Sequence, residues 1–297
     1  MRLLLVLAIV LINTVLFTSA GKKNKCGPMV KEHNCECKAK SEGQLKMEGG
    51  KLLMCDGSEY KALQFEMPSK NSRANPAYSC KEIKDEDTAA EDGIYWLTFK
   101  SDPAVFPVYC DMSNGGWTMI FKAVSGAKEN AFNAYNSGET LAENDMSALD
   151  VTTKTGDYKS RIILNWAEFS ISEAKVVLYE GNSAVKELFF NAQGSDKLNW
   201  FSNDKLKEPY PWTDVKNGEQ NSFSIQGLSG RNFFINKSYG GCPNDNGWMA
   251  ITSTHCSWEN RFGEEKNVVL YSKLETYTNW NTADNVGKAD VLAVFVR

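Results

Sequence analysis

Short stretches in which apolar and polar side chains alternate recur along the chain after residue 90. Ile94 and Trp96 alternate with Tyr95 and Leu97, and Phe106–Cys110 follows the same rule. A period of two residues is typical of β-strands, and Gly, Asn, Asp and Pro between such stretches indicate turns. The pattern predicts further strands at Ala174–Tyr179, Val185–Asn191, Ser222–Gln226, Asn232–Asn236, Trp248–Thr252, Val268–Ser272 and Val291–Val296.

Helical periodicity is scarce by comparison. The two candidates are a modest helix at Leu141–Leu149 and a shorter one at Asn165–Phe169. The sequence therefore predicts a mainly β fold of the α+β class, with antiparallel sheets, few short helices and long loops.

The first twenty residues have the composition of a secretory signal peptide. An apolar run begins at Leu3 and is followed by Thr18-Ser19-Ala20, which predicts cleavage after Ala20. The alternative is a retained signal anchor, but the run falls short of the ~20 residues that span a membrane. No later segment approaches that length, so we expect no membrane span after cleavage and predict a secreted protein.

The chain has eight cysteines. An even number in a secreted protein is most simply explained by four disulfides without a free thiol. Four of them lie in residues 21–65, a segment with few large apolar side chains that needs such bonds to fold: Cys26, Cys35, Cys37 and Cys55.

Two pairings of these four cysteines are open. The first joins Cys26 to Cys35 and Cys37 to Cys55, and the second joins Cys26 to Cys37 and Cys35 to Cys55. We favour the first, because it closes a predicted hairpin that turns at two glycines. Its strands are Gly43–Met47 and Lys51–Cys55. A metal site is not expected, because His33 is the lone histidine of this segment.

Residues 66–77 form a predicted linker, since they are polar and contain Pro68 and Pro76. A second, larger domain is expected over residues 78–297. No heptad repeat and no Gly-X-Y tract precedes that domain, so neither of these oligomerisation devices is predicted.

The start of the larger domain resembles a fibrinogen-related domain, the fibrinogen C-terminal globular domain. The matching residues, in order, are Cys80, Gly93, Tyr95, Val108, Tyr109, Cys110, Asp111, Met112, Gly115, Gly116, Trp117 and Thr118. The resemblance implies an antiparallel sheet domain, and a disulfide from Cys80 to Cys110 would tie its first strands together.

A second part of the same resemblance lies near residue 250. Cys242, Gly247, Trp248 and Cys256 follow the order of the family's second disulfide, which implies a Cys242–Cys256 bond. The family's calcium loop would fall at Ser229–Gly241, which has no carboxylate, so we expect no calcium and no other cofactor there.

The family's acetyl-group pocket is not predicted either. Its Cys-His followed by Asn-Leu-Asn-Gly is replaced here by the stretch from His255 to Asn260, His-Cys-Ser-Trp-Glu-Asn. The Cys-rich start together with the ending Ala289–Phe295 resembles the skeletal organic matrix proteins of stony corals. That similarity implies secretion into an extracellular matrix that meets calcium carbonate.

Charge and short motifs limit the other functions that the chain could have. A net charge of −4 without a basic stripe argues against nucleic acid as a partner. The chain has no Gly-x-Ser-x-Gly, His-Glu-x-x-His or phosphate-loop motif, and a structural or exposed-loop role is favoured for His33 and His255, so no catalytic residue and no enzyme activity are predicted. Asp245, within Asn244-Asp245-Asn246-Gly247, is a weak metal candidate that a turn explains equally well.

Two surface features remain. The sequon Asn236-Lys237-Ser238 predicts an N-glycan at Asn236 if the segment is exposed. A group of aromatics could form a sugar-binding surface, although core packing is the favoured role for most of them. They are Trp200, Phe201, Tyr210 and Trp212.

Two classes of function fit these observations. The first is a secreted extracellular matrix protein with a structural or adhesive role, possible partners being matrix proteins and calcium carbonate mineral. The second is a lectin-like recognition protein that binds glycans or acetylated ligands. The absent oligomerisation segment and the altered pocket favour the first.

Overall fold

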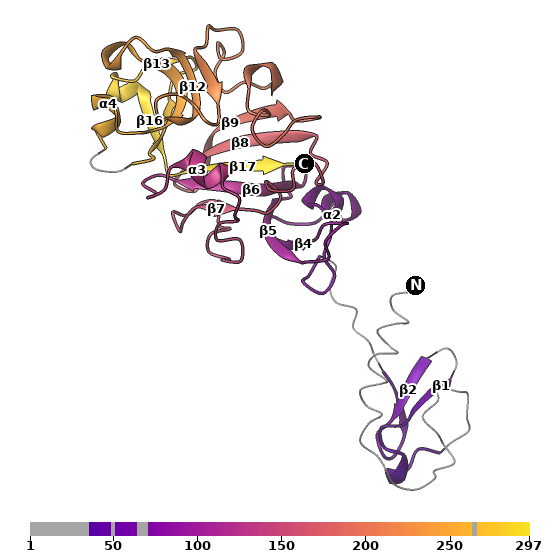
Figure 1. Cartoon of the computed structure of the whole chain (residues 1–297). Helices are drawn as coiled ribbons and strands as arrows, with labels where there is room; N and C mark the ends of the chain where they lie inside the picture. The colour runs from indigo at the N-terminus through magenta and orange to yellow at the C-terminus, as the bar shows by residue number, and fades with distance from the viewer. Residues whose placement is uncertain (1–35, 49–50, 64–70, 263–265) are drawn as a thin grey trace. The chain divides into compact units, whose positions relative to one another are not determined.

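The computed structural model describes residues 36–48, 51–63, 71–262 and 266–297. The chain divides into two compact units, Met1–Met67 and Pro68–Arg297 (Figure 1). The predicted signal peptide, Cys26, His33 and Cys35 lie outside the described residues. Within the described residues, no helix has the length and apolar character needed to cross a membrane.

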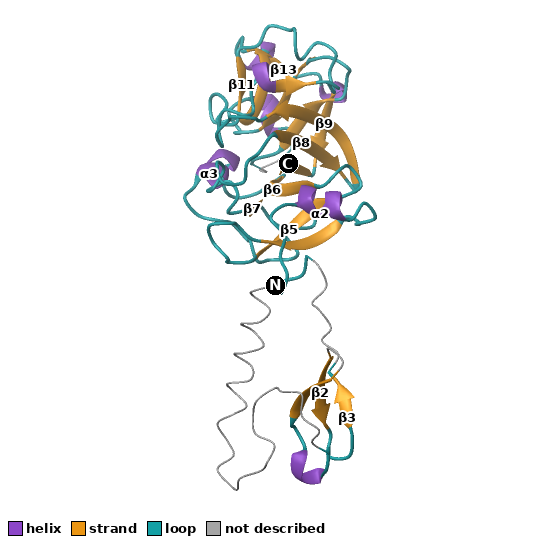
Figure 2. Ribbon diagram, turned by 90° about the vertical axis from the view of Figure 1, so that its right-hand side faces the viewer, coloured by secondary structure: helices purple, strands orange, loops and turns teal. Residues whose placement is uncertain are grey.

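The small unit is a three-stranded antiparallel sheet in the order β1-β2-β3 (Figure 2). Leu45 pairs with Met54 and Met47 with Leu52, so the two first strands form the predicted hairpin. A disulfide joins Cys37 to Cys55, with Cα atoms 5.3 Å apart, and this bond excludes the alternative that pairs Cys35 with Cys55. The elements are η1 (Ala39–Ser41), β1 (Leu45–Glu48), β2 (Lys51–Cys55) and β3 (Tyr60–Ala62).

The large unit is built on an eight-stranded sheet in the order β10-β9-β8-β17-β6-β5-β4, with β7 paired to β6. Every strand pair is antiparallel. Strand β17 lies between β8 and β6, and all its residues are buried. The strands are β4 (Gly93–Leu97), β5 (Phe106–Asp111), β6 (Trp117–Val124), β7 (Tyr158–Lys159), β8 (Glu173–Glu180), β9 (Ser183–Asn191), β10 (Leu206–Lys207) and β17 (Val291–Val296).

A second antiparallel sheet of six strands has the order β11-β12-β13-β14-β16, with β15 paired to β13. One apolar core joins both sheets: the ring of Phe121 on β6 stacks on that of Phe233 at 5.8 Å. The strands are β11 (Ser222–Ser224), β12 (Asn232–Ser238), β13 (Asn246–Ile251), β14 (Val269–Ser272), β15 (Thr278–Asn279) and β16 (Val286–Ala289). The fold is mainly β, as the sequence predicts.

The helices differ from the prediction. Leu141–Leu149 and Asn165–Phe169 form bends and turns rather than helices. The structure instead has α2 (Cys80–Glu86), α3 (Ala131–Asn136) and α4 (Ser257–Asn260), with the 3-10 turns η2 (Asn203–Lys205), η3 (Cys242–Asn244) and η4 (Ala283–Asn285). Helix α2 begins after Ser79, whose hydroxyl accepts a hydrogen bond from the Glu82 amide at 3.0 Å.

Residues 71–77, part of the predicted linker 66–77, belong to the large unit. The Trp96 amide donates to the Asn71 carbonyl at 3.3 Å, and the Ala77 amide donates to the Trp96 carbonyl at 3.1 Å. Residues 71–77 therefore lie along β4 and belong to the large unit. Their backbone groups complete the outer edge of that strand, which composition could not indicate.

Candidate functional site around the second disulfide

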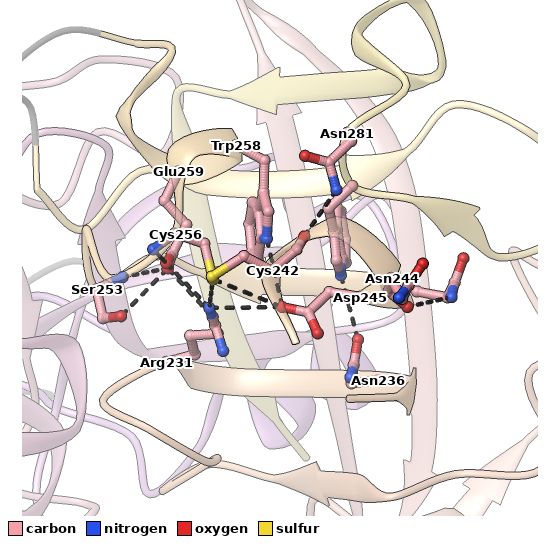
Figure 3. A network of polar contacts seen from close by, with 12 residues as sticks. Arg231, Asn236, Cys242, Asn244, Asp245, Ser253, Cys256, Trp258, Glu259 and Asn281 are labelled. Atoms are coloured by element: carbon pink, nitrogen blue, oxygen red, sulfur yellow. Dashed lines mark hydrogen bonds and ion pairs between the residues drawn. A yellow bond between two sulfur atoms is a disulfide. The ribbon is translucent and has the colours of Figure 1, made fainter. Parts of the chain in front are cut away.

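Three buried charged side chains, Arg231, Asp245 and Glu259, meet beside the Cys242–Cys256 disulfide. The disulfide holds the Cα atoms of Cys242 and Cys256 5.3 Å apart. The turn η3 and the strand β13 follow the first cysteine, and the helix α4 follows the second. Figure 3 shows that Arg231, which precedes β12, reaches toward this disulfide.

Arg231 and Glu259 form a buried ion pair. The Nη2 atom of Arg231 lies 3.0 Å from Oε2 of Glu259, and Nε donates to Oε1 at 3.2 Å. Both side chains are fully buried. This is a bidentate pair, in which two guanidinium nitrogens donate to the two oxygens of one carboxylate. Such geometry is needed to offset the cost of removing two charges from water.

Glu259 also holds the backbone around it. Its carboxylate accepts hydrogen bonds from the amides of Ser253 at 2.8 Å and Cys256 at 2.7 Å. Burial acts to raise the pKa of Glu259, but the hydrogen bonds from Arg231 and from these amides outweigh it and hold the pKa below its usual value. From helix α4, the Glu259 side chain thus binds Arg231, which precedes β12, and the backbone of the disulfide-bonded Cys256.

Asp245 is a second carboxylate beside the same guanidinium. Its Oδ2 atom accepts from the Trp258 indole at 3.3 Å and lies 3.7 Å from Nη2 of Arg231. Burial raises the pKa of Asp245, and the nearby charge of Glu259 adds to that shift. Oδ1 of Asp245 and Nη1 of Arg231 are buried without a hydrogen-bond partner among the described residues.

Aromatic rings enclose this charged group. The guanidinium of Arg231 lies 4.9 Å from the ring centroid of Trp258 and 5.4 Å from that of Tyr239. Trp258 stacks on Trp280 with 5.4 Å between centroids. A cation against ring faces is attracted by their negative potential, so the rings stabilise Arg231 as well as cover it.

The structure corrects two predictions at this site. Asp245, the weak metal candidate, faces Arg231 and Trp258 in the interior rather than an open turn, so a metal ion would meet the guanidinium. The described residues contain no group of three or more His, Cys, Asp or Glu side chains placed to hold a metal ion. Most of the segment Ser229–Gly241, where the family's calcium loop would fall, is strand β12 here.

Asn236 is the second correction, because its side chain is completely buried. Its Nδ2 atom donates to the Asn221 side chain at 3.2 Å and to the Ser238 carbonyl at 3.0 Å, while Oδ1 accepts from the Trp280 indole at 3.1 Å. An N-glycan would be attached at that Nδ2 atom. The predicted glycan is therefore incompatible with this packing.

The remaining candidate residues are dispersed. His255 is exposed beside the disulfide, which agrees with the favoured loop interpretation. Trp200, Phe201 and Trp212 are buried in the core that joins the two sheets, whereas Tyr210 is only partly buried. Tyr210 lines an open, shallow hollow with Glu208, Pro209 and Thr213.

The disulfide from Cys80 to Cys110 lies apart from this site and joins α2 to β5, with Cα atoms 5.6 Å apart. Next to it, a Cβ on Gly116 would lie 2.7 Å from the Cys80 carbonyl oxygen, so only glycine fits. The pairs at residues 80–110 and 242–256 are those that the resemblance implies.

Arg231 and Glu259 were missed by the sequence analysis. Glu259 carries a weak signal, because it stands three residues after Cys256 at the start of a helix, where a glutamate commonly accepts from the capping amide. Arg231 carries none, since only the fold brings it to Glu259. The arrangement has no proton-transfer partner open to solvent, and what it does is fix the backbone of the Cys242–Cys256 segment.

Solved fibrinogen-like globe domains are among the structures to which this chain is distantly similar. No protein-family model matches the chain. The fibrinogen-like globe domain of human ANGPTL2 has 16% sequence identity and a TM-score of 0.26, over 38% of this chain and 49% of that chain. For the fibrinogen-like globe domain of human ANGPTL6 the identity is 14% and the TM-score 0.34, over 74% and 95% of the two chains. This chain thus spans about half the length of the first.

Proposed function

We propose that the protein is a secreted component of an extracellular matrix, with a structural or adhesive role exerted through contacts of its outer surface. The observation that carries the proposal is the filled site at the second disulfide. Arg231, Asp245 and Trp258 are buried there against one another, near the place where the fibrinogen-domain resemblance implies an acetyl-group pocket. The three disulfides of the described residues favour an oxidising compartment outside the cytosol.

We further propose that the matrix is the organic matrix of a calcium carbonate skeleton. The support is the similarity of the Cys-rich start and of Ala289–Phe295 to coral skeletal proteins. Proteomics of the source tissue should find peptides of this chain in the matrix left after bleaching and demineralisation of mineral. Peptides found only in soft tissue would contradict this placement.

Binding assays test the adhesive role. Purified mature protein should bind plates coated with decellularised matrix from the source tissue, and a glycan array should give no signal with or without calcium. Heat-denatured protein at the same concentration is the control for non-specific adsorption. Selective, saturable binding to one glycan class, with no matrix binding, would overturn the proposal in favour of a lectin.

The hollow at Tyr210 is the observation that favours this second candidate. A partly exposed aromatic ring beside Glu208 and Thr213 combines a stacking surface with hydrogen-bonding groups. If the protein is a lectin that uses this hollow, Tyr210→Ala should abolish its glycan signal. Tyr78→Ala, at a position 44% exposed elsewhere on the large unit, is the matched control and should leave the signal unchanged.

A further inference from the structure

Among residues 36–48 and 51–63, one edge of the small sheet has no backbone partner. The Leu52 carbonyl accepts a hydrogen bond from the Leu63 amide at 2.9 Å, so the backbone groups of Leu52 face β3. Met47, which lies opposite Leu52 on β1, is therefore a non-hydrogen-bonded partner, and its own N–H and C=O point away from β2. Leu45 is turned outward in the same way. Within the described residues, neither has a backbone partner on that side.

In the large unit, the edge strand β4 has backbone partners on its outer side. The outer edge of β4 is covered by residues 71–77, with bonds from Trp96 to Asn71 and from Thr98 to Ala77. An uncovered edge is a template for another strand, and proteins usually protect such edges. No described residue gives strand β1 this protection.

One face of the small sheet is apolar as well. Leu45 and Met47 lie directly opposite Met54 and Leu52, so the four side chains share a face. None of them is buried, and Met54 is 39% exposed. We call these four residues the Leu/Met face.

The other face of β1 carries opposite charges two residues apart. Lys46 and Glu48 project on that side, and within one chain Nζ of Lys46 lies 2.7 Å from Oε2 of Glu48. A strand that runs antiparallel to an identical strand about a two-fold axis at Met47 places residue 46 opposite residue 48. The edge is therefore complementary in charge to a second copy of itself.

We propose that two copies of this protein associate by antiparallel pairing of their β1 strands about Met47. Met47 then exchanges two backbone hydrogen bonds with Met47 of the second copy, because both have outward-facing N–H and C=O groups. Each Lys46 faces a Glu48 of the other copy, and the two Leu/Met faces join into one continuous apolar surface. The occupant of the edge is thus a second copy of this chain, which forms a six-stranded sheet.

The dimer goes beyond the proposed matrix role and does not depend on it. It gives two large units on one assembly, so that two weak contacts with a repetitive surface act together. The sequence contains no coiled coil or collagen-like tract before the large unit, and the small unit would take the place of such a device.

Charge reversal tests the pairing. Sedimentation velocity of the mature chain over a range of concentrations should show a monomer–dimer equilibrium that weakens as salt is raised. Lys46→Glu places like charges opposite each other twice and should raise the dissociation constant about tenfold. The double variant Lys46→Glu with Glu48→Lys inverts both signs and should restore dimerisation.

A second variant addresses the backbone. Met47→Pro removes the outward N–H, which β2 does not use, and should abolish the dimer while the Cys37–Cys55 bond still forms in a non-reducing peptide map. A wild-type chain that stays monomeric at all concentrations would overturn the proposal. So would unchanged dimerisation in Lys46→Glu, or a double variant as weak as the single one when its peptide map is native.

Discussion

The ammonium group of Lys175 lies 2.6 Å from Oδ2 of Asp111, with both side chains buried in the central sheet. The same nitrogen is 5.1 Å from the ring centroid of Trp117 and 5.0 Å from that of Phe295. Asp111 belongs to the Tyr-Cys-Asp-Met sequence of the family resemblance. Asp111 therefore pairs with a buried cation in the interior of the domain.

Removing the cation of this pair should destabilise the large unit. Lys175→Met leaves a buried carboxylate without its partner, a change that typically costs about 3 to 5 kcal/mol. Urea unfolding measures the loss. Lys207→Met is the matched control, because Lys207 pairs with Glu173 at a site where the lysine side chain is 44% exposed, and such pairs contribute less than about 1 kcal/mol. Equal losses in both variants would contradict this assignment.

Neutralising the two carboxylates beside Arg231 should change the stability of the large unit in different ways. Glu259→Gln removes the charge that pairs with the guanidinium and should cost about 3 to 5 kcal/mol at neutral pH. Asp245→Asn keeps an oxygen for the Trp258 indole and removes the surplus negative charge, so stability should stay within about 1 kcal/mol of wild type or rise. Thermal melts of both variants decide the matter, and a larger loss in Asp245→Asn would refute it.

The pKa shifts of Glu259 and Asp245 predict how the stability of wild type and variants depends on pH. The pKa of Glu259 is lowered in the folded state, so its contribution is present above its usual value of 4.5 and is lost as the pH falls through the folded pKa. The pKa of Asp245 is raised, so its ionisation costs stability as the pH rises above 3.8. The advantage of Asp245→Asn over wild type should therefore grow from acidic to neutral pH, as denaturant titrations at several pH values would measure.

Asn236 should carry no glycan in the folded protein, despite its sequon. Intact mass of the protein purified from a glycosylating eukaryotic host should show no hexose, and glycosidase treatment should leave the mass unchanged. The tight packing predicts a second effect: a Cβ on Gly247 would lie 2.4 Å from Oδ1 of Asn236 and 2.8 Å from the Ile235 carbonyl oxygen. Gly247→Ala should thus cost about 1 to 3 kcal/mol. A glycopeptide containing Asn236 in native protein would show that this segment opens.

Reduction should affect stability far more than chelation. The disulfides Cys80–Cys110 and Cys242–Cys256 span sequence separations of 30 and 14 residues. Each contributes on the order of 3 to 4 kcal/mol in the chain-entropy treatment. Thermal melts with dithiothreitol should show a steep fall in Tm, whereas EDTA should shift it little. A large EDTA shift with a small dithiothreitol shift would instead indicate a structural metal ion.

Most of the strands could be predicted from the sequence, because alternation with a period of two and short apolar runs between turn residues are both local signals. Val291–Val296 is found at the expected residues, since an unbroken apolar run suits a strand buried on both sides. The helices could not be placed in the same way. The apolar residues of Leu141–Leu149 suggest a helix, but Leu141 forms an isolated bridge to Lys159 and the rest turns back on itself.

Helix α2 shows that a local helix signal is present in the sequence near Cys80. Asp85 and Glu86 end this helix, and Asp87 caps it. Ser79 followed three residues later by Glu82 is a capping-box pattern that marks the helix start. The Arg231 network, in contrast, depends on contacts between segments far apart in sequence, which no local pattern encodes.

Because β17 lies between β6 and β8, the large sheet cannot be completed until residues 291–296 have been synthesised. Its neighbours β6 and β8 leave the ribosome long before residues 291–296 do, and the two cannot pair with each other across the empty position between them. Until then the nascent large unit exposes two unfilled strand edges, whereas β1, β2 and β3 of the small unit can pair with one another as soon as they are synthesised. These edges stay open until synthesis reaches β17, so we expect the large unit to fold more slowly than the small one.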